Sequence, residues 1–366
     1  MYHRIIKSQI QYWLNKTNKV IILYGARQVG KTTLAREIGD LFDKEYIYID
    51  CENFEIQEVL NSRNVEILKR FVGKAKLIIF DEAQKVQYIG IALKLLHDHL
   101  PSLKIIATGS SSFERANKLS EPLTGRNVKL HLFPLSLKEI TGNQNMFEIS
   151  SGINNILRFG TYPDIYGIGE IRKPQQFKDL IITLAYLIGQ TVTYSDIAKK
   201  LETDRGTVQR YMHLLEKTFI IKILRPLHRS HVREILHPFK IYFWDLGVRN
   251  FLVEDFKPIK QRIGGEIGSI WENFCIIERI KKNEYGEIGS NSNYGINKNY
   301  YFWRTKESSP KEYDLIEDYN GHFDVFEMKY NLKKEKSVKK YDIFFKTYPN
   351  STLNIISQEN WWEWLV

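Results

Sequence analysis

A short apolar run, VIILYG at 20–25, leads directly into the octet GARQVGKT at 25–32. The residues that follow, TTLAREIGDLF at 32–42, are predicted to form a helix. Two glycines with four residues between them, followed by lysine and threonine, are typical of a tight loop between a buried strand and a helix. Backbone N–H groups of such a loop and of the helix N-terminus form a cradle for an anion. This feature restricts the fold to a sheet in which strands and helices alternate.

Four further apolar runs continue the alternation: YIYID at 46–50, LIIFDE at 77–82, IIATGSS at 105–111 and VKLHLF at 128–133. Such runs, separated by helix-length segments, indicate parallel strands covered by helices on both faces. The chain has 366 residues, too many for one ordinary hydrophobic core, and its 43% hydrophobic and 26% charged residues make a globular composition. We therefore predict an α/β doubly wound first domain, followed by further domains.

The octet predicts a nucleotide site with ATP and Mg²⁺ as cofactors. Lys31 would reach the β- and γ-phosphates, and Thr32 would bind Mg²⁺. The alternative, a chance glycine-rich turn, fits poorly with the strand and helix on either side. The predicted cofactor-binding residues of this segment are Gly25, Ala26, Arg27, Gln28, Val29, Gly30, Lys31, Thr32 and Thr33.

The run LIIFDE delivers two carboxylates at the end of a strand that we expect beside the strand carrying the loop. Asp81 would hold Mg²⁺, while Glu82 would be the catalytic base for the attacking water and Lys31 a second catalytic residue. A surface turn after a core strand is the alternative for the acidic pair. Thr108 and Ser110 end another strand, where they would either sense the γ-phosphate or cap the following helix.

Residues 150–175 are rich in glycine and proline and predict a connector, after which the periodicity becomes helical. SDIAKKL at 195–201, the turn ETDRG and TVQRYMHLLEKTFII at 207–221 predict a helix-turn-helix. The residues expected in solvent on its second helix are Gln209, Arg210, His213 and Lys217, opposite a buried face of Val208, Tyr211, Leu214 and Leu215.

Such a helix can lie in the major groove of duplex DNA. Arg205 and the basic stretch RPLHRSHVR at 225–233, a candidate β-wing, would then contact phosphates. The alternative is a packing module between two domains whose charges are simply solvated.

Several stretches together resemble a known family. They are GARQVGKTTL, LIIFDEAQ, IIATGSSS, PLTGR at 122–126, LFPLSLKEI at 132–140, RFGTYPDIY at 158–166, KIYFWDLGVRN at 240–250 and IGSIWENF at 267–274. They resemble uncharacterised prokaryotic AAA-type ATPases in which a P-loop domain precedes a winged helix and a PD-(D/E)XK nuclease-like domain. The chain departs from that family at GTYPD, where two glycines more often precede Tyr-Pro.

The resemblance implies an AAA-like strand order in a P-loop ATPase domain over 1–150. A connector and winged helix would follow over 151–239, and an α/β nuclease-like domain over 240–366. The resemblance also implies that Arg126 is a catalytic arginine that meets the γ-phosphate, in cis or from a neighbouring subunit. A structural ion pair is the alternative for this residue.

The segments YDLIED and FEMKY supply Asp314, Glu327 and Lys329 on predicted strands. Because strand side chains alternate, Glu327 and Lys329 share a face, where Lys329 would polarise water on Mg²⁺ or Mn²⁺ held by the carboxylates. This resembles the PD-(D/E)XK signature, which implies Glu272 of WENF as a further metal ligand. E-x-K alone is common on strands, so we expect either a nuclease or a nuclease-like fold kept for binding.

The net charge of +10 favours an acidic partner such as nucleic acid. The chain has only two cysteines, no secretory signal and no apolar run near the roughly 20 residues of a membrane span, so we expect a cytoplasmic protein. The tail WWEWLV would pack onto the last domain.

The leading hypothesis is an ATP-driven switch that repositions a DNA-binding winged helix and a nuclease-like domain. The alternative is a regulatory ATPase whose C-terminal half binds a protein partner and never cuts DNA. Either could be a monomer or a homo-oligomer.

Overall fold

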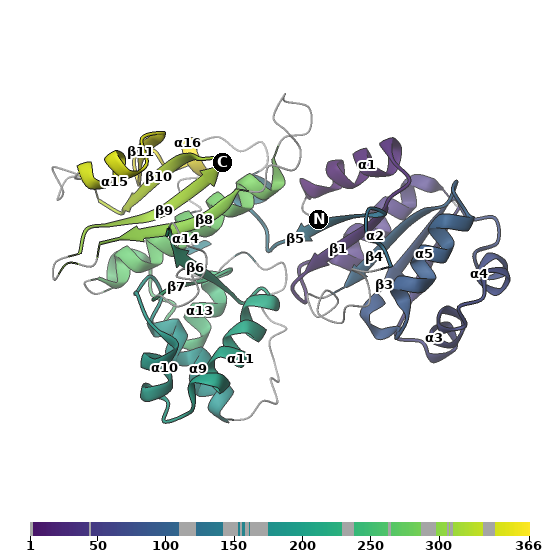
Figure 1. Cartoon of the computed structure of the whole chain (residues 1–366), viewed down its shortest axis with the longest axis horizontal. Helices are drawn as coiled ribbons and strands as arrows, with labels where there is room; N and C mark the ends of the chain where they lie inside the picture. Colours follow the sequence, from purple (N-terminus) through teal and green to yellow (C-terminus); the bar gives the residue numbers. More distant parts are fainter. Residues whose placement is uncertain are drawn as a thin grey trace. The chain divides into compact units, whose positions relative to one another are not determined.

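The computed structural model describes residues 3–43, 45–109, 122–141, 153, 156–157, 161, 175–228, 238–262, 265–286, 298–305, 307, 310–331 and 341–366. The chain forms two compact units (Figure 1). The first comprises Met1–Leu135 and Lys217–Phe219, and the second comprises Ser136–Glu216 and Ile220–Val366.

The first unit contains a five-stranded sheet in which every neighbouring pair of strands is parallel. Its strands are β1 (Val20–Gly25), β2 (Tyr46–Asp50), β3 (Leu77–Asp81), β4 (Lys104–Gly109) and β5 (Asn127–Leu132). Each strand coincides with one of the five apolar runs to within one or two residues, which confirms the predicted α/β fold.

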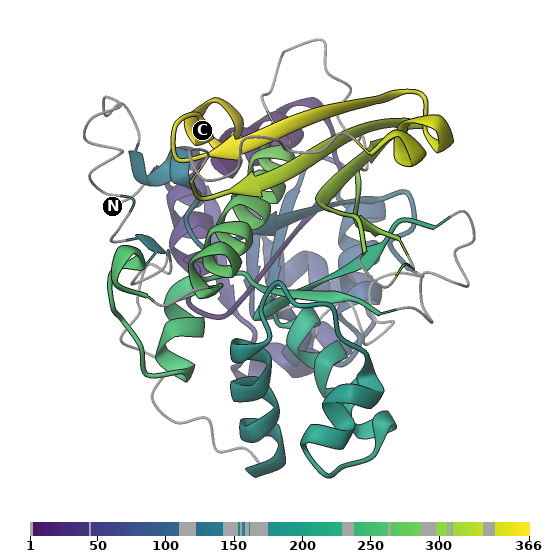
Figure 2. The same ribbon diagram turned by 90° about the vertical axis from the view of Figure 1, so that its left-hand side faces the viewer.

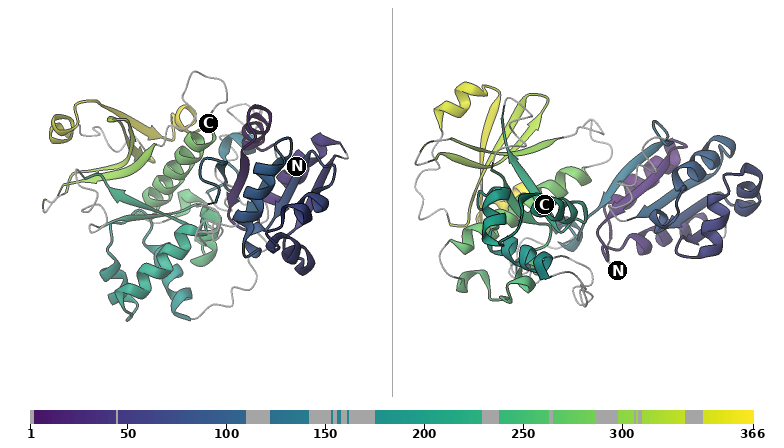
Figure 3. Two further views of the ribbon diagram at one scale, coloured as in Figure 1. Left: turned by 45° about the vertical axis from the view of Figure 1, so that its right-hand side comes forward. Right: turned by 60° about the horizontal axis from the view of Figure 1, so that its bottom comes forward.

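Helices cover both faces of this sheet (Figure 3). One face packs against α3 (Phe54–Asn61), α4 (Val65–Val72) and α5 (Ile89–His99) through buried side chains such as Ile22, Ile78 and Leu93. The elements α1 (Ile6–Lys16) and α2 (Lys31–Gly39) pack against each other and against the sheet. The three central strands β1, β3 and β4 are buried on both faces and are apolar almost without interruption, whereas the edge strands β2 and β5 are partly exposed.

The strand order is β2-β3-β4-β1-β5, which corrects one sequence prediction. We expected LIIFDE beside the strand that carries the loop, but β4 lies between them, pairing with β1 at Ile106 and with β3 at Ile105. All of these strands are equally apolar, so the local pattern contains no information about which of them are neighbours. The inserted strand brings its own last residues, including Thr108, between the loop and Asp81.

The second unit contains a six-stranded mixed sheet in the order β11-β10-β9-β8-β6-β7. Its strands are β6 (Ile221–Pro226), β7 (Lys240–Phe243), β8 (Asn299–Arg304), β9 (Glu312–Tyr319), β10 (His322–Lys329) and β11 (Ser351–Ser357). The long helix α14 (Glu266–Tyr285) lies along this sheet (Figure 2). Glu317 of β9 is fully buried and anchors the helix, because Arg279 binds one of its oxygens at 2.6 Å and Lys298 the other at 2.8 Å.

Three helices precede β6: α9 (Gln175–Tyr186), α10 (Tyr194–Lys200) and α11 (Arg205–Lys217). The strand β6 pairs antiparallel with β7 and parallel with β8. The domain boundary predicted between residues 239 and 240 therefore falls inside one continuous sheet. The division into three domains stays a prediction.

Four further α-helices lie in the described part of the second unit: α7 (Leu137–Thr141), which comes before α9 in the chain, and α13 (Leu246–Leu252), α15 (Asp342–Thr347) and α16 (Trp361–Leu365), each of which comes after a strand. Trp361 and Leu365 of α16 are buried, and the Trp364 ring packs 5.6 Å from that of Phe326. The interpretation of the WWEWLV tail as packed aromatic surface is confirmed.

Some predicted features lie outside the described residues: Ser110, most of the connector at 150–175 and the second half of the basic stretch at 225–233. Among the helices of the described ranges, none has both the length and the apolar character that a membrane crossing needs.

Gly39 closes α2 directly against Tyr46, and a Cβ on this residue would lie 2.5 Å from the tyrosine ring. We expect Gly39→Ala to lower the free energy of unfolding by about 1–3 kcal/mol through overpacking. Gly268→Ala in α14 is the matched control, because its Cβ would meet no atom within 4 Å. Alanine is the better helix former, so the control should gain up to about 1 kcal/mol. Urea unfolding of both variants measures the two changes in unfolding free energy. If both variants were stabilised, or both destabilised, the packing argument would be refuted.

Candidate functional site

The glycine-rich loop connects the end of β1 to the start of α2. A Cβ at Gly25 would lie 2.4 Å from the carbonyl oxygen of Leu132 on β5, so only glycine fits there. Gln28 and Gly30 take positive φ angles of 63° and 93°, which turn the loop tightly back toward the helix. The helix then begins at Lys31, whose N-terminal position directs free N–H groups toward the concave side of the loop.

Lys31 lies inside this loop with a side chain that is almost wholly buried. Its Nζ donates hydrogen bonds to the carbonyl oxygens of Gly25 at 3.2 Å and Ala26 at 2.8 Å. Burial lowers the pKa of Lys31, and the nearby charges of Glu82 and Asp81 oppose that change. The ammonium is therefore held beside the acidic pair, as the sequence predicts.

Arg4 holds the loop from outside and was not predicted. One of its terminal nitrogens donates to the carbonyl oxygen of Val29 at 2.9 Å and the other to that of Phe133 at 2.6 Å. The guanidinium thereby ties the loop to the segment after β5. Nothing in the sequence near Arg4 distinguishes it from a surface arginine.

The carboxylate of Asp81 accepts hydrogen bonds from three hydroxyl groups on three different elements. Thr32 of α2 donates at 2.7 Å and Tyr48 of β2 at 2.5 Å to one oxygen, and Thr108 of β4 donates to the other. Burial alone would raise the pKa of Asp81, but the three hydrogen bonds together lower it. The structure thus brings together Thr32, Asp81 and Thr108, and it adds Tyr48.

Tyr48 is a site residue that sequence reasoning missed. Burial and its hydrogen bond to Asp81 raise the pKa of Tyr48 to about 12, so the hydroxyl keeps its proton at physiological pH and donates a hydrogen bond to the carboxylate. The Arg36 guanidinium lies 4.2 Å from the centre of its ring. In the sequence, YIYID reads only as a strand, and no local signal marks its second tyrosine.

Glu82 follows Asp81 in a left-handed backbone conformation with φ 51° and ψ 40°. This turn directs its side chain away from the strand, where the Gln84 amide donates to its carboxylate. Its own N–H donates to the Thr108 hydroxyl at 3.3 Å. The predicted base is therefore held by its neighbours rather than loose at the surface.

Arg126 lies elsewhere. It immediately precedes β5, and its carbonyl oxygen accepts from the N–H of Val20, the first residue of β1. The loop leaves the opposite end of β1, about 20 Å away along a six-residue strand. Arg126 pairs with Asp98 at 2.9 Å. It cannot reach the phosphate cradle of its own chain, so the cis role is wrong, and the ion pair that we held as the alternative is present.

The oxygen donors at the first site suit Mg²⁺. That ion is usually bound by one or two carboxylates together with substrate phosphates and water. The Asp81 carboxylate and the Thr32 hydroxyl lie next to each other beside the loop and would be the ligands that the protein contributes.

The four residues predicted for a nuclease centre also converge, in the second unit. Asp314 of β9, Glu327 and Lys329 of β10 and Glu272 of α14 lie in one partly buried cluster. Burial is the main cause that raises the pKa of Glu272 and of Glu327 above the usual range. Sequence reasoning missed a fifth member, Lys240 of β7.

This cluster does not fit a metal ion as it stands. The Lys240 ammonium lies 2.9 Å from Glu272, 2.5 Å from Glu312 and 3.8 Å from Asp314. In the described part of the chain, no three acidic, histidine or cysteine side chains are arranged to hold one metal ion. No hydrolytic step is therefore derived through a metal there.

The helix-turn-helix segment has largely the predicted faces. Gln209, Arg210 and His213 of α11 are exposed, and Arg205 at its start is exposed as well. Val208 and Leu215 are buried, together with Met212, which the prediction left out. Tyr211 and Leu214, expected to be buried, and Lys217, expected in solvent, are all half-buried.

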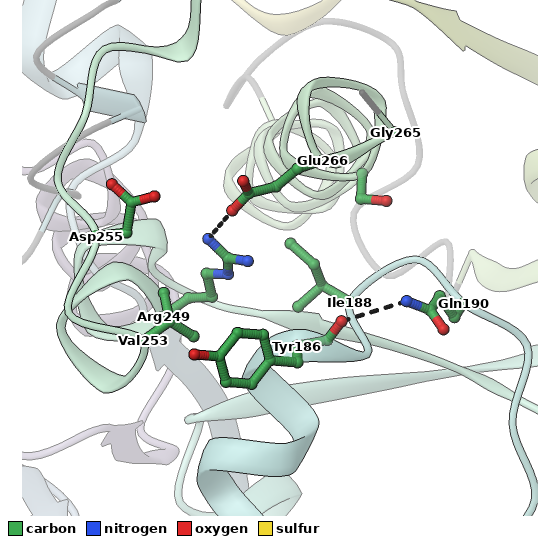
Figure 4. A pocket seen from close by; sticks show the side chains of 9 residues that line it. Tyr186, Ile188, Gln190, Arg249, Val253, Asp255, Gly265 and Glu266 are labelled. Atoms are coloured by element: carbon green, nitrogen blue, oxygen red, sulfur yellow. Dashed lines mark hydrogen bonds and ion pairs between the residues drawn. The ribbon is translucent and has the colours of Figure 1, made fainter. Parts of the chain in front are cut away.

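A polar pocket of about 480 Å³ lies in the second unit (Figure 4). Arg249 reaches it from α13 and pairs with Glu266 of α14 at 2.8 Å. Arg262 binds the same carboxylate oxygen at 2.8 Å. Arg262 also lies 3.8 Å from Asp255, so two arginines face two carboxylates and their charges balance. We therefore assign no ligand to the pocket.

Three family models match successive parts of the chain. Residues 17–141 match one described as an AAA domain, and residues 133–258 and 267–360 match two domains of unknown function, DUF8612 and DUF4143. Together with the parallel sheet and the loop, the first match identifies the first unit as an AAA-type P-loop domain.

Sequence similarity to other proteins extends over most of the chain. A Mycobacterium tuberculosis (strain ATCC 25618 / H37Rv) protein, described as uncharacterized, is 24% identical over 85% of this chain and 70% of its own length. An uncharacterized protein of Methanocaldococcus jannaschii is 24% identical over 92% of this chain and 81% of its own.

Two solved structures show a weaker likeness. The RuvB Holliday junction branch migration motor of Thermotoga maritima is 14% identical with a TM-score of 0.33, over 63% of this chain and 94% of that chain. AMPPCP-bound DnaA from Aquifex aeolicus is 14% identical with a TM-score of 0.26, over 58% and 87%. Scores this low carry no argument about the present chain.

Tyr48→Phe removes one of the three hydroxyl groups that fix Asp81. Hydrogen bonds that orient a ligand typically contribute ten- to a hundredfold to metal affinity. We expect Mg²⁺ to be retained by the nucleotide complex about tenfold less tightly, with nucleotide affinity in EDTA unchanged. Titration with Mn²⁺ followed by electron paramagnetic resonance measures this.

Tyr46→Phe is the matched control for this experiment. It lies on the same strand, and its hydroxyl donates to Asp40 at 3.0 Å instead of to Asp81. Equal Mn²⁺ affinity for Tyr48→Phe and the parent chain would contradict the proposed orienting contact.

Proposed function

We propose that this protein is a Mg²⁺-dependent ATPase of the AAA type. The observation that carries this proposal is the convergence of Thr32, Tyr48 and Thr108 on Asp81, directly beside the buried Lys31. Lys31 would turn from the loop carbonyls to the β- and γ-phosphates, and Asp81 and Thr32 would hold the metal. Bound Mg²⁺ would supply charge neutralisation of the phosphates. Glu82 would accept a proton from the attacking water.

Two substitutions separate binding from turnover. Glu82→Gln keeps the shape of the side chain but removes its basicity, so we expect ATP binding close to that of the parent chain and turnover reduced at least a hundredfold. Lys31→Ala should lose ATP binding itself, because the phosphates lose their buried cation. Calorimetry and phosphate release measure the two quantities. Parent-like turnover in Glu82→Gln would refute its role as base.

Arg126 could contact a γ-phosphate only at the nucleotide site of another subunit. Its side chain is 38% exposed at the edge of the sheet opposite its own cradle. We propose that it contacts the γ-phosphate of a neighbouring copy in a homo-oligomer.

We further propose that the second unit binds double-stranded DNA through α11. The order of elements supports a winged helix: α9, then a bridge from Val192 to Phe239, then α10, α11 and the antiparallel pair of β6 and β7. The exposed face of α11 offers Gln209 and Arg210, and Arg205 precedes them. Such a surface can combine base contacts with phosphate contacts.

Arg210→Ala should weaken duplex binding and lower the salt dependence of the binding constant by about one unit of slope, because one phosphate contact is lost. Its only described hydrogen bond is to the Thr207 hydroxyl at 2.8 Å, so stability should change little. Arg70→Ala on α4 removes the same charge from another exposed helix and is the matched control. Fluorescence anisotropy at several salt concentrations measures both. Binding that is indifferent to salt would argue against phosphate contacts.

A second candidate function is a regulatory ATPase whose C-terminal half binds a protein partner and does not cleave DNA. The specific observation that favours it over a nuclease is the Lys240 ammonium among the carboxylates of that half. We propose a cytoplasmic location for either function, consistent with two buried free cysteines.

A further inference from the structure

We propose that Lys240 is the resident cation of the C-terminal carboxylate cluster, where its ammonium takes the place of a divalent metal ion. The inference concerns the second unit and does not depend on ATP hydrolysis in the first. It assigns Lys240 a site that the nuclease resemblance would give to Mg²⁺ or Mn²⁺.

The ammonium lies at the centre of the cluster. Lys240 extends from β7 with a side chain that is 2% exposed. Its Nζ lies 2.9 Å from Glu272 of α14 and 2.5 Å from Glu312 of β9, and Asp314 of β9 is at 3.8 Å. An ammonium has three donors and no acceptor. Glu272 and Glu312 are within hydrogen-bond distance of it, and Asp314 adds a longer charge contact.

Charge explains why the lysine and the carboxylates require each other. A buried ammonium is costly unless it is paired, and so is a group of buried carboxylates. The Lys240 ammonium contacts Glu272 and Glu312 directly, and these two carboxylates offset the cost of burying its charge. A divalent ion bound to the same oxygens at the usual 2.0–2.6 Å would lie within a few ångströms of this charge. In a buried site that repulsion is large.

One oxygen each of Glu272, Asp314 and Glu327 also has another donor. The Glu272 oxygen that contacts Lys240 also accepts from the Tyr242 hydroxyl at 2.6 Å. Asp314 accepts from the N–H of Met328 at 2.8 Å through one oxygen. Lys329, which the signature would place beside a metal-bound water, instead pairs with Glu327 at 2.8 Å.

Removal of the ammonium would free the Glu312 oxygen that it contacts and the Asp314 oxygen that faces it. A buried Glu327 oxygen already has no hydrogen-bond partner. Replacing Lys240 with a neutral side chain should therefore convert the cluster from one that excludes divalent ions to one that binds them.

The test is Mn²⁺ binding to the full chain, followed by electron paramagnetic resonance without nucleotide. Asp81→Asn is present in every arm to remove the first metal site. With Lys240 intact, we expect the same Mn²⁺ binding whether or not Asp314→Asn is added. Lys240→Met should gain one site at least tenfold tighter than any in the parent, and Asp314→Asn should abolish that gain.

Lys281→Met is the matched control, because Lys281 is also almost fully buried and pairs with Glu278 at 2.8 Å. It should gain no Mn²⁺ site. Mn²⁺ bound to the parent and lost on Asp314→Asn would overturn the proposal, as would a folded Lys240→Met without any gain. If Lys240→Met fails to fold, Lys240→Gln replaces it. The comparison of the chain with Lys240 intact, with and without Asp314→Asn, still decides whether the cluster holds a metal.

Discussion

The carboxylate of Asp81 is the point on which the first unit depends. Parallel strands end at the same edge of a sheet, so residues far apart in sequence can place hydroxyl groups around one acid. Thr32 comes from the helix after β1, Tyr48 from β2 and Thr108 from β4. A buried carboxylate without these partners would be costly. With them it stays ionised and fixed, which is the state that a magnesium ion requires.

The two acidic centres of the molecule offset the cost of burying carboxylates in different ways. Asp81 is satisfied by neutral hydroxyl donors, which leave its negative charge available to an incoming cation. The C-terminal carboxylates are satisfied by Lys240, whose charge already neutralises part of theirs. One centre is therefore arranged to receive an ion, and the other already has one. Carboxylates at one position in space are not sufficient to identify a metal site.

Much of the first unit could be predicted from sequence because its determinants are local. The strand, the glycines and the helix start of the loop lie within fourteen consecutive residues, from 20 to 33. The neighbours of Asp81 could not all be predicted, because strand order is set by packing among equally apolar strands. No local sequence signal marks Tyr48 as a neighbour of Asp81. The family resemblance implies a γ-phosphate contact for Arg126, but Arg126 immediately precedes β5, at the end of the sheet opposite the loop of its own chain. In the second unit, Glu327 and Lys329 follow from strand alternation, whereas Lys240 lies 72 residues before Glu312 and meets it only through the fold.

The second unit has a mechanical consequence for any nucleotide-driven switch. The strand β6 is bonded to β7 on one side and to β8 on the other, so the helices before β6 connect directly to the sheet that bears the carboxylate cluster. Lys240 adds a second connection, because it extends from β7 to α14 and β9. The bridge between Val192 and Phe239 and the hydrogen bond from the Ile223 N–H to Glu216 at 3.2 Å join the segment of α10 and α11 to the start of this sheet. A movement that keeps these contacts would carry the carboxylate cluster together with α10 and α11.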